Sequence, residues 1–175
     1  PKLTDLGVKT IAQSKTIVSL YLDDTAISDS AIDYLASAGK LITFSMKGCK
    51  NIEGRSIGRL KKLGILLLAR SGFKPANCGQ LKELTNLAIL DLCDLDIRNK
   101  DVANLEGLKV QDLKLSNNPK LTDSCLHSLE KMNLLKKVDL SGCSGISENA
   151  RKNFANQSAS SLKVIVSGDS DAGKI

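Results

Sequence analysis

Aromatic side chains are scarce in this sequence, at 3% of 175 residues with no tryptophan. Proteins that hold single-stranded nucleic acid stack its bases on aromatic rings, so this scarcity counts against that function.

His127 is the only histidine, and on its helical pattern it should face solvent. The cysteines lack the Cys-x2-Cys spacing typical of zinc sites. No apolar run reaches the roughly 18 residues that a membrane span needs. We predict no enzyme activity, no metal and no cofactor.

The five cysteines are an odd number, and they are scattered through the chain. That distribution does not resemble a disulfide framework. It favours free thiols and therefore a reducing compartment. The segment Pro1–Asp5 also lacks the apolar core of a signal peptide. We therefore expect an intracellular protein, cytoplasmic or nuclear.

Leucine, in contrast, is abundant and regularly spaced. The pattern Leu-x-x-Leu-x-Leu-x-x-turn, with other apolar residues allowed, occurs six times. The third apolar residues of the copies are Leu22, Met46, Leu68, Leu92, Leu115 and Leu140. Their spacings are 24, 22, 24, 23 and 25 residues, a period that indicates a repeat protein in which each unit packs only on its neighbours.

Each repeat reads as a strand, a tight turn and a short helix. Ser28-Asp29, Thr122-Asp123 and Ser147-Glu148 start the return segments with a helix N-cap and an acid that the helix dipole favours. Two return segments are weaker. The segment 74–79 contains Pro and Gly and predicts a short helix starting near Asn77, and the segment 98–108 is short and polar.

The predicted fold is therefore an α/β solenoid, a curved horseshoe with parallel strands on the concave face and short helices on the convex face. We expect one domain over 1–167, with about seven repeats, and a tail over 168–175. A last helix is expected over 150–160 and a seventh strand over 162–166, in an ambiguous register. Pro1–Asp5 recurs letter for letter at 119–123, where it follows a strand. The first copy has no strand before it, so we expect a longer protein that continues upstream.

The turn position should be occupied by a buried side chain that satisfies backbone carbonyls left unpaired by the bend. Asn118 donates well, Cys49 and Cys143 weakly, and Thr25 and Ser71 through hydroxyls. Leu95 cannot donate, so we predict an irregular turn or an ordered water there.

Cys49, Cys143 and the Ser/Thr-Asp/Glu helix starts resemble the cysteine-containing subfamily of leucine-rich repeats, the type found in F-box substrate receptors. This resemblance implies that the concave sheet binds another protein. A ubiquitin-ligase receptor is one specific version, although no F-box lies in these residues.

Strand alternation predicts which side chains line the concave face. Ile65, Leu67, Ala69, Ile89 and Cys93 form an apolar island on a face that should be polar, and contiguous exposed apolar surface often marks a partner site. A neighbouring segment covering the island, or a register slip, is the alternative. The predicted partner-binding residues are Tyr21, Ile65, Leu67, Ile89, Asp91, Lys114 and Asp139.

The net charge of +6 is concentrated in the window 40–74, which carries nine basic residues and one acid, Glu53. Arg55, Arg59, Lys61 and Lys62 could bind an acidic protein, RNA or a phosphoinositide, but we favour a solvated face.

The segment Gly168–Lys174 fits part of a phosphate-binding loop. Ile175 replaces the Ser or Thr that would hold magnesium, and two aspartates would repel phosphate. We therefore expect no nucleotide site.

Overall fold

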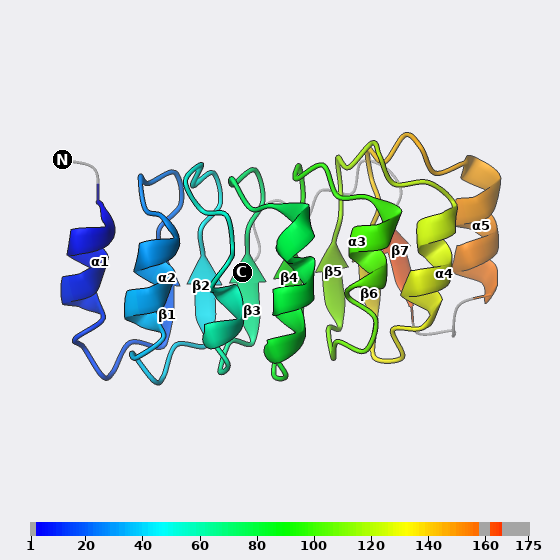
Figure 1. The fold of residues 1–175 in the computed structure, drawn as a ribbon. Helices are drawn as coiled ribbons and strands as arrows, with labels where there is room; N and C mark the ends of the chain where they lie inside the picture. The colour runs from blue at the N-terminus through cyan, green and yellow to red at the C-terminus, as the bar shows by residue number, and fades with distance from the viewer. Residues whose placement is uncertain (1–2, 158–161, 166–175) are drawn as a thin grey trace.

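Seven short strands form a single parallel sheet whose order follows the sequence from β1 to β7. The computed structural model describes residues 3–157 and 162–165. The strands are β1 (Ser19–Tyr21), β2 (Thr43–Ser45), β3 (Ile65–Leu67), β4 (Ile89–Asp91), β5 (Asp112–Lys114), β6 (Lys137–Asp139) and β7 (Lys163–Ile165). Figure 1 shows them side by side along the molecule.

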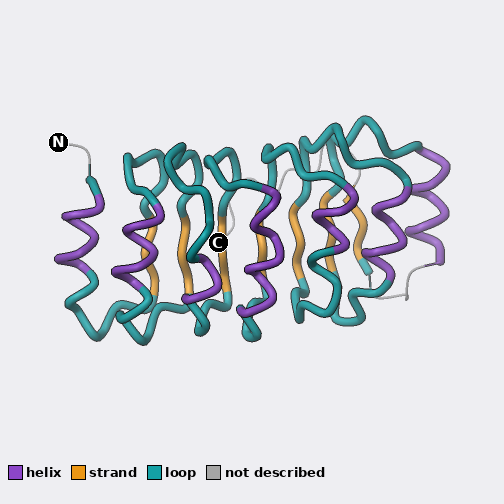
Figure 2. The backbone as a smooth tube through the Cα atoms, in the orientation of Figure 1, coloured by secondary structure: helices purple, strands orange, loops and turns teal. Residues whose placement is uncertain are grey.

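The helices form a second layer in front of the sheet (Figure 2). The α-helices are α1 (Asp5–Ile11), α2 (Asp29–Leu35), α3 (Asn99–Ala103), α4 (Ser124–Glu130) and α5 (Glu148–Gln157). Two return segments form 3-10 helices instead, η1 (Ile57–Arg59) and η2 (Pro75–Glu83). This arrangement confirms the predicted α/β solenoid, and no helix within the described ranges is long and apolar enough to cross a membrane.

The apolar residues of the repeat build one continuous core between the two layers. The central strand residues pair in register as Leu20, Phe44, Leu66, Leu90, Leu113, Val138 and Val164. From Phe44 to Val138 these side chains are fully buried, and the third-position residues from Leu22 to Leu140 are buried as well. Burying an aliphatic side chain stabilises the fold by about 1.5–3 kcal/mol, so these two rows of buried side chains supply much of the folding free energy.

The structure settles the register of the seventh strand, which the sequence left ambiguous. Strand alternation had placed Val164 in an outward row and Val166 beside Asp139. In the structure Val164 pairs with Val138 and packs against the core, while Ile165 pairs with Asp139. The strand is thus shifted by one residue, which exchanges its two faces. Val166 itself, the predicted tail and the boundary at 167 lie outside the described residues.

The helix starts agree in part with the sequence. The Ser28 hydroxyl caps α2 by accepting from the Ser30 amide at 3.3 Å, as predicted. The predicted cap Thr122 does not cap α4, whose N-cap residue is Asp123 and makes no side-chain cap bond. In the weak segment, η2 begins at Pro75 rather than near Asn77. Proline suits a first helical position because its fixed φ is already helical and its missing amide is not needed there.

Coil 3, which runs from the turn after β2 through η1 to β3, is the shortest, and its packing against coil 4 depends on two glycines. Its return segment has only the three-residue η1 where coil 2 has the seven-residue α2. Gly54 has φ +85°, and a Cβ there would lie 2.3 Å from the Phe73 ring. A Cβ on Gly72 would lie 2.0 Å from the Lys50 carbonyl oxygen. Both positions need glycine because the neighbouring coil approaches so closely.

A column of left-handed residues closes the turns. The residue before each turn position has φ between 55° and 71°: Asp24, Gly48, Arg70, Asp94, Asn117 and Gly142. Gly, Asn and Asp tolerate this conformation best, and five of the six are of these types.

Candidate functional site

The turn side chains have structural roles. Cys49 and Cys143 donate from Sγ to the carbonyls of Leu22 and Leu115, at 3.0 and 3.1 Å. The Thr25 hydroxyl donates to Leu22 O at 2.7 Å. Ser71 differs, because its hydroxyl accepts from the Phe73 amide at 3.2 Å. Thr25, Cys49 and Cys143 therefore satisfy backbone carbonyls as predicted, whereas the prediction is wrong for Ser71.

The turn at Leu95 has no polar side chain of its own, and Asn118 of the next coil satisfies its backbone groups. Asn118 Oδ1 accepts from the amides of Leu95 and Ile97 at 3.1 and 2.9 Å, and its Nδ2 donates to Leu92 O at 3.0 Å. Asp96 adds a left-handed residue, φ 58°, that the equivalent turns lack. The predicted irregularity is present, and a side chain from the next coil does what we assigned to water.

The cysteines are free and buried, all five of them. Burial raises the pKa of the Cys78 and Cys125 thiols to about 12, and it also raises those of Cys93 and Cys143. Protonated, buried thiols are poor nucleophiles. His127 is exposed, as predicted, and lies 3.6 Å from Glu130. Within the described ranges no group of three His, Cys, Asp or Glu side chains is placed to bind a metal.

A ladder of acidic side chains links successive coils along the turn edge. Asp5 accepts from the Ser28 amide at 2.8 Å, and Asp123 accepts from the Ser147 amide at 2.6 Å. Asp29 accepts from three consecutive amides, Glu53 to Arg55, at 2.8–2.9 Å. The sequence had assigned these acids to the helix dipole alone. Their recurrence about 24 residues apart was the signal that could have revealed the link.

The sheet face, which is the row of side chains pointing away from the helices, contains all seven predicted partner-binding residues. Tyr21 is exposed, at 58%. Ile65, Ile89, Lys114 and Asp139 are half-buried. They come from β1, β3, β4, β5 and β6, so the pairing register brings them onto one surface.

The prediction of an exposed apolar island is wrong for three of its members. Leu67, Ala69 and Cys93 are 5%, 7% and 8% exposed, although they lie outside the contiguous core. Asp91 is also buried, at 7%, and accepts from the Cys93 amide at 3.0 Å. Of the apolar island only Ile65 and Ile89 keep partial exposure.

Mixed charges lie on the β5 and β6 part of the sheet face. Lys137 Nζ is 3.8 Å from Asp112 Oδ2, while Asp112 Oδ1 is buried without a hydrogen-bond partner. Asp139 Oδ1 accepts from the Ser141 hydroxyl and amide at 2.6 and 2.9 Å. Lys114 lies between Asp91 and Asp139 in the aligned row.

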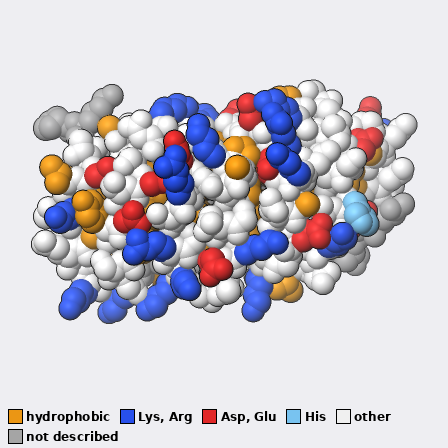
Figure 3. Space-filling view, viewed as in Figure 1, with side chains coloured by type: hydrophobic (Ala, Val, Ile, Leu, Met, Phe, Trp, Pro, Cys, Tyr) orange, Lys and Arg blue, Asp and Glu red, His pale blue; other side chains and the backbone are white. Residues whose placement is uncertain are grey.

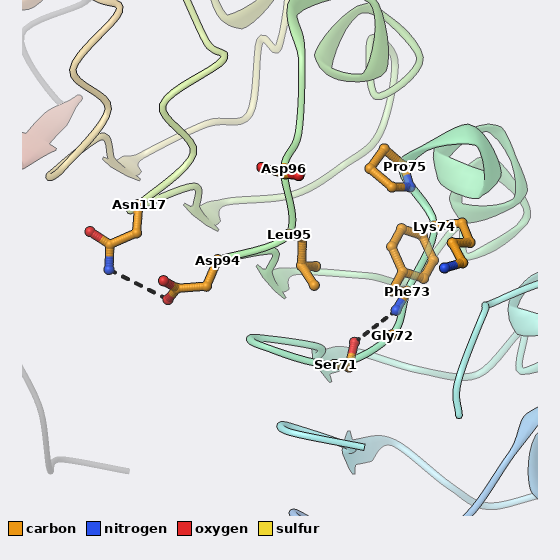
Figure 4. A pocket seen from close by; sticks show the side chains of 9 residues that line it. All are labelled: Ser71, Gly72, Phe73, Lys74, Pro75, Asp94, Leu95, Asp96 and Asn117. Carbon is orange, nitrogen blue, oxygen red and sulfur yellow. Dashed lines mark hydrogen bonds between the residues drawn. The ribbon is translucent and has the colours of Figure 1, made fainter. Parts of the chain in front are cut away.

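A pocket of about 510 Å³ opens at the turn edge of coils 4 and 5. Figure 4 shows Phe73 and Pro75 on one side of it and Asp94 with Asn117 on the other. Its amide and carboxylate side chains are already paired, because Asn117 donates to Asp94 at 3.4 Å and Asp96 binds Lys120 at 2.8 Å. The hydrogen bond from Lys120 lowers the pKa of Asp96. We assign no ligand to this pocket.

The predicted basic residues lie at exposed positions of coil 3. Arg55 pairs with Glu53, Arg59 with Asp33, and Lys61 Nζ lies 3.7 Å from Glu83. Lys62 has no acidic partner in the described part of the chain. The segment 168–174, where we expect no nucleotide site despite its partial match to a phosphate-binding loop, lies outside the described residues.

No protein-family model matches this sequence. Over 114 residues, 63% of this chain, it is 35% identical to "Receptor-like protein EIX1" of Solanum lycopersicum and spans 11% of that protein. The internalin inlF of Listeria monocytogenes aligns over 93% of this chain and 51% of its own, with TM-score 0.67 and 21% identity. Internalin C2 of the same organism aligns over 94% of this chain and 76% of its own, with TM-score 0.63 and 17% identity. With the parallel sheet and its helix layer, these likenesses identify a leucine-rich-repeat fold.

Proposed function

We propose that this chain is a protein-interaction module that binds a protein partner through the sheet face and performs no catalysis itself. The observation that carries the proposal is the alignment of side chains from five strands on one preformed surface. A rigid surface loses little ordering entropy on binding, which favours recognition. The receptor-like name of the tomato relative supports the same class of function.

The burial of Leu67 and Asp91 moves the proposed contacts to the rest of the face. Tyr21 offers the largest exposed ring, and Tyr is enriched in binding hot spots. Lys114 and Asp139 add opposite charges that fix orientation. Ile65 and Ile89 supply the partly exposed apolar centre.

The test compares two charge-matched variants of the full chain in affinity capture followed by binding assays with each purified candidate. Tyr21→Ala with Lys114→Glu alters the sheet face, and Tyr34→Ala with Lys82→Glu alters the helix side. A partner whose affinity falls at least tenfold with the first variant alone supports the proposal. Equal loss with both, or retention with both by every partner found, contradicts it.

A substrate receptor of a ubiquitin ligase is the finer version of this function, in line with the repeat type. It requires an F-box encoded upstream of Pro1, and sequencing the full-length transcript tests it directly. A transcript without one removes this version and leaves the interaction module in place.

Binding of RNA or a phosphoinositide by Arg55, Arg59, Lys61 and Lys62 is a second candidate, supported by their exposure and by the charge of the 40–74 window. Affinity for such a polyanion should fall steeply with salt, whereas apolar docking on the sheet should hardly respond.

A further inference from the structure

A small pocket on the helix side lies where the shortest coil meets the basic window. Its volume is about 180 Å³, and it lies between the end of α2 and the segment after η1. Coil 2 has a seven-residue α-helix here, whereas coil 3 has a three-residue 3-10 helix. The last turn of α2 therefore lacks an equivalent turn beside it, and the difference leaves the hollow.

The floor of this pocket is apolar. Leu35, Leu41 and Leu60 line it and are 1%, 4% and 5% exposed, and Ala36 lies half-buried beside them. Ile42, next to Leu41 in sequence, is 47% exposed, an uncommon state for so large an apolar residue in this chain. The site can therefore take one aliphatic side chain. At 180 Å³ it is smaller than the roughly 300–1,000 Å³ typical of small-molecule sites.

The rim of the pocket is basic. Arg59, Lys61 and Lys62 line it, and exposed Lys40 lies between the lining residues Gly39 and Leu41. Arg59 and Lys61 already have the acids Asp33 and Glu83 nearby. Lys40 and Lys62 have no acidic partner within the described residues and are available for an incoming carboxylate. In Figure 3 Lys and Arg side chains follow the lower rim of this face, below α2.

We propose that this pocket docks an acidic segment of a partner protein, with one aliphatic side chain on the leucine floor and flanking carboxylates on Lys40 and Lys62. Charge complementarity steers the segment to the site, and the apolar anchor fixes its register. The structure favours a peptide over RNA because no free aromatic ring from the described residues is nearby. Phe44 is fully buried, and the Tyr34 ring lies under Lys9 Nζ, 5.6 Å from its centroid.

The probe is a synthetic nine-residue peptide of glutamates with one central leucine, titrated into the ¹⁵N-labelled full chain and followed by amide chemical shifts. We expect saturable shifts at Leu41, Leu60 and Lys62. Replacing the central leucine by alanine should weaken binding about tenfold, because roughly 1–2 kcal/mol of apolar transfer is lost.

Two variants separate the pocket from its charge. Lys40→Glu with Lys62→Glu should weaken binding at least tenfold, whereas Lys100→Glu with Lys109→Glu, an equal charge change at exposed sites elsewhere, should weaken it less than twofold. Ala36→Leu should fill the hollow without changing charge and abolish the leucine preference, with its melting temperature reported alongside as the folding control.

Three results would overturn the docking proposal. Loss with Lys40→Glu/Lys62→Glu but equal binding of the leucine and alanine peptides would make the site a bare charged patch. Tighter binding of a single-stranded RNA 12-mer or of anionic vesicles at the same residues would assign it to another class of partner. If the peptide induced no amide chemical-shift change at low salt, the pocket would not bind an acidic segment and the proposal would be wrong. The sheet-face variant Tyr21→Ala should leave peptide affinity unchanged, so failure here is distinct from failure of the interaction function above.

Discussion

Asn118 joins two coils through a single carboxamide. It is fully buried, and its two polar atoms satisfy groups in both its own turn and the preceding one. The preceding turn has Leu95, which contributes no polar atom. The Leu95 turn therefore depends on Asn118 alone, whereas the carbonyl of Leu22 in the first turn accepts from two side chains, Thr25 and Cys49.

We predict that Asn118→Ala lowers the free energy of unfolding by at least about 3 kcal/mol, because several buried backbone groups lose their only side-chain partner and each unpaired group costs about 1–3 kcal/mol. Asn99→Ala is the matched control, since Asn99 bonds only to Thr122 near the surface. It should cost less than about 1 kcal/mol. Urea denaturation monitored by circular dichroism gives both values. Equal costs would show that the shared turn is unimportant.

Asp29 should matter far more than its neighbour Asp33. Asp29 accepts from three backbone amides of the next coil, whereas Asp33 makes an exposed pair with Arg59. We expect Asp29→Ala to cost about 2 kcal/mol or more, and Asp33→Ala less than about 1 kcal/mol. Thermal and urea unfolding of the two variants decide this. A costly Asp33→Ala with a silent Asp29→Ala would refute the ladder as a stabilising device.

The sequence predicted the turn residues but missed the acid ladder, and the reason is physical. Thr25 bonds within its own turn, whereas Cys49 and Cys143 reach back 27 and 28 residues, but the repeat pattern marks every turn position as a buried side chain whichever coil it bonds. Asp29 bonds to amides 24–26 residues away, and that partner is known only once the stacking register is known.

At the scale of elements, two glycines in neighbouring segments provide a direct test of coil packing. A Cβ on Gly72 would lie 2.0 Å from the Lys50 carbonyl oxygen, whereas a Cβ on Gly79 would meet nothing within 4 Å. Gly72→Ala should therefore destabilise by about 1–3 kcal/mol through overpacking against backbone. Gly79→Ala should be neutral or slightly stabilising, because the unfolded chain loses entropy. Melting temperatures of the two variants would contradict this packing if both fell equally.

Elements were predictable where periodicity and turn chemistry agreed. The strands β1 to β6 and the helix α2 follow from the leucine spacing and the Ser28 cap. The register of the seventh strand was not predictable, because the alternating residues Leu162, Val164 and Val166 could face either the core or the solvent. Pairing with Val138 decides the register, and that pairing is a tertiary contact.

At the scale of the molecule, the sheet face is less open than alternation alone implies. Alternation places Leu67 and Cys93 on the side away from the helices, and the structure agrees, yet both are buried. Strand periodicity reports the direction of a side chain and contains nothing about what lies over it. The face was therefore predictable as a surface, and the exposure of its centre was not.

The buried thiols make the stability of the whole fold depend on pH in the alkaline range. The folded state holds the pKa of Cys78 and Cys125 at about 12, above the ordinary 9.0, so it keeps protons that the unfolded chain releases. Their contribution is complete below about pH 8.5 and is lost as pH rises toward 12, at up to about 1.4 kcal/mol per pH unit for each thiol.

The measurement is the urea midpoint of the wild type and of Cys78→Ala between pH 7 and 10.5. The variant should show a shallower decline above pH 9, because one linked proton is gone. Parallel declines in both proteins would mean that the Cys78 thiol ionises in the folded state as it does in the unfolded chain.

The short return segments of coils 3 and 4 also set how strongly the molecule bends. Parallel strands lie about 4.8 Å apart, while packed α-helices need about 8–10 Å, so every full helix acts as a wedge that opens the outer side. Coil 3 has a three-residue η1 in place of that wedge. The arc should be flattest where η1 lies and tighter toward α4 and α5, so lengthening the 56–60 segment by one α-helical turn would shorten the radius of the whole horseshoe.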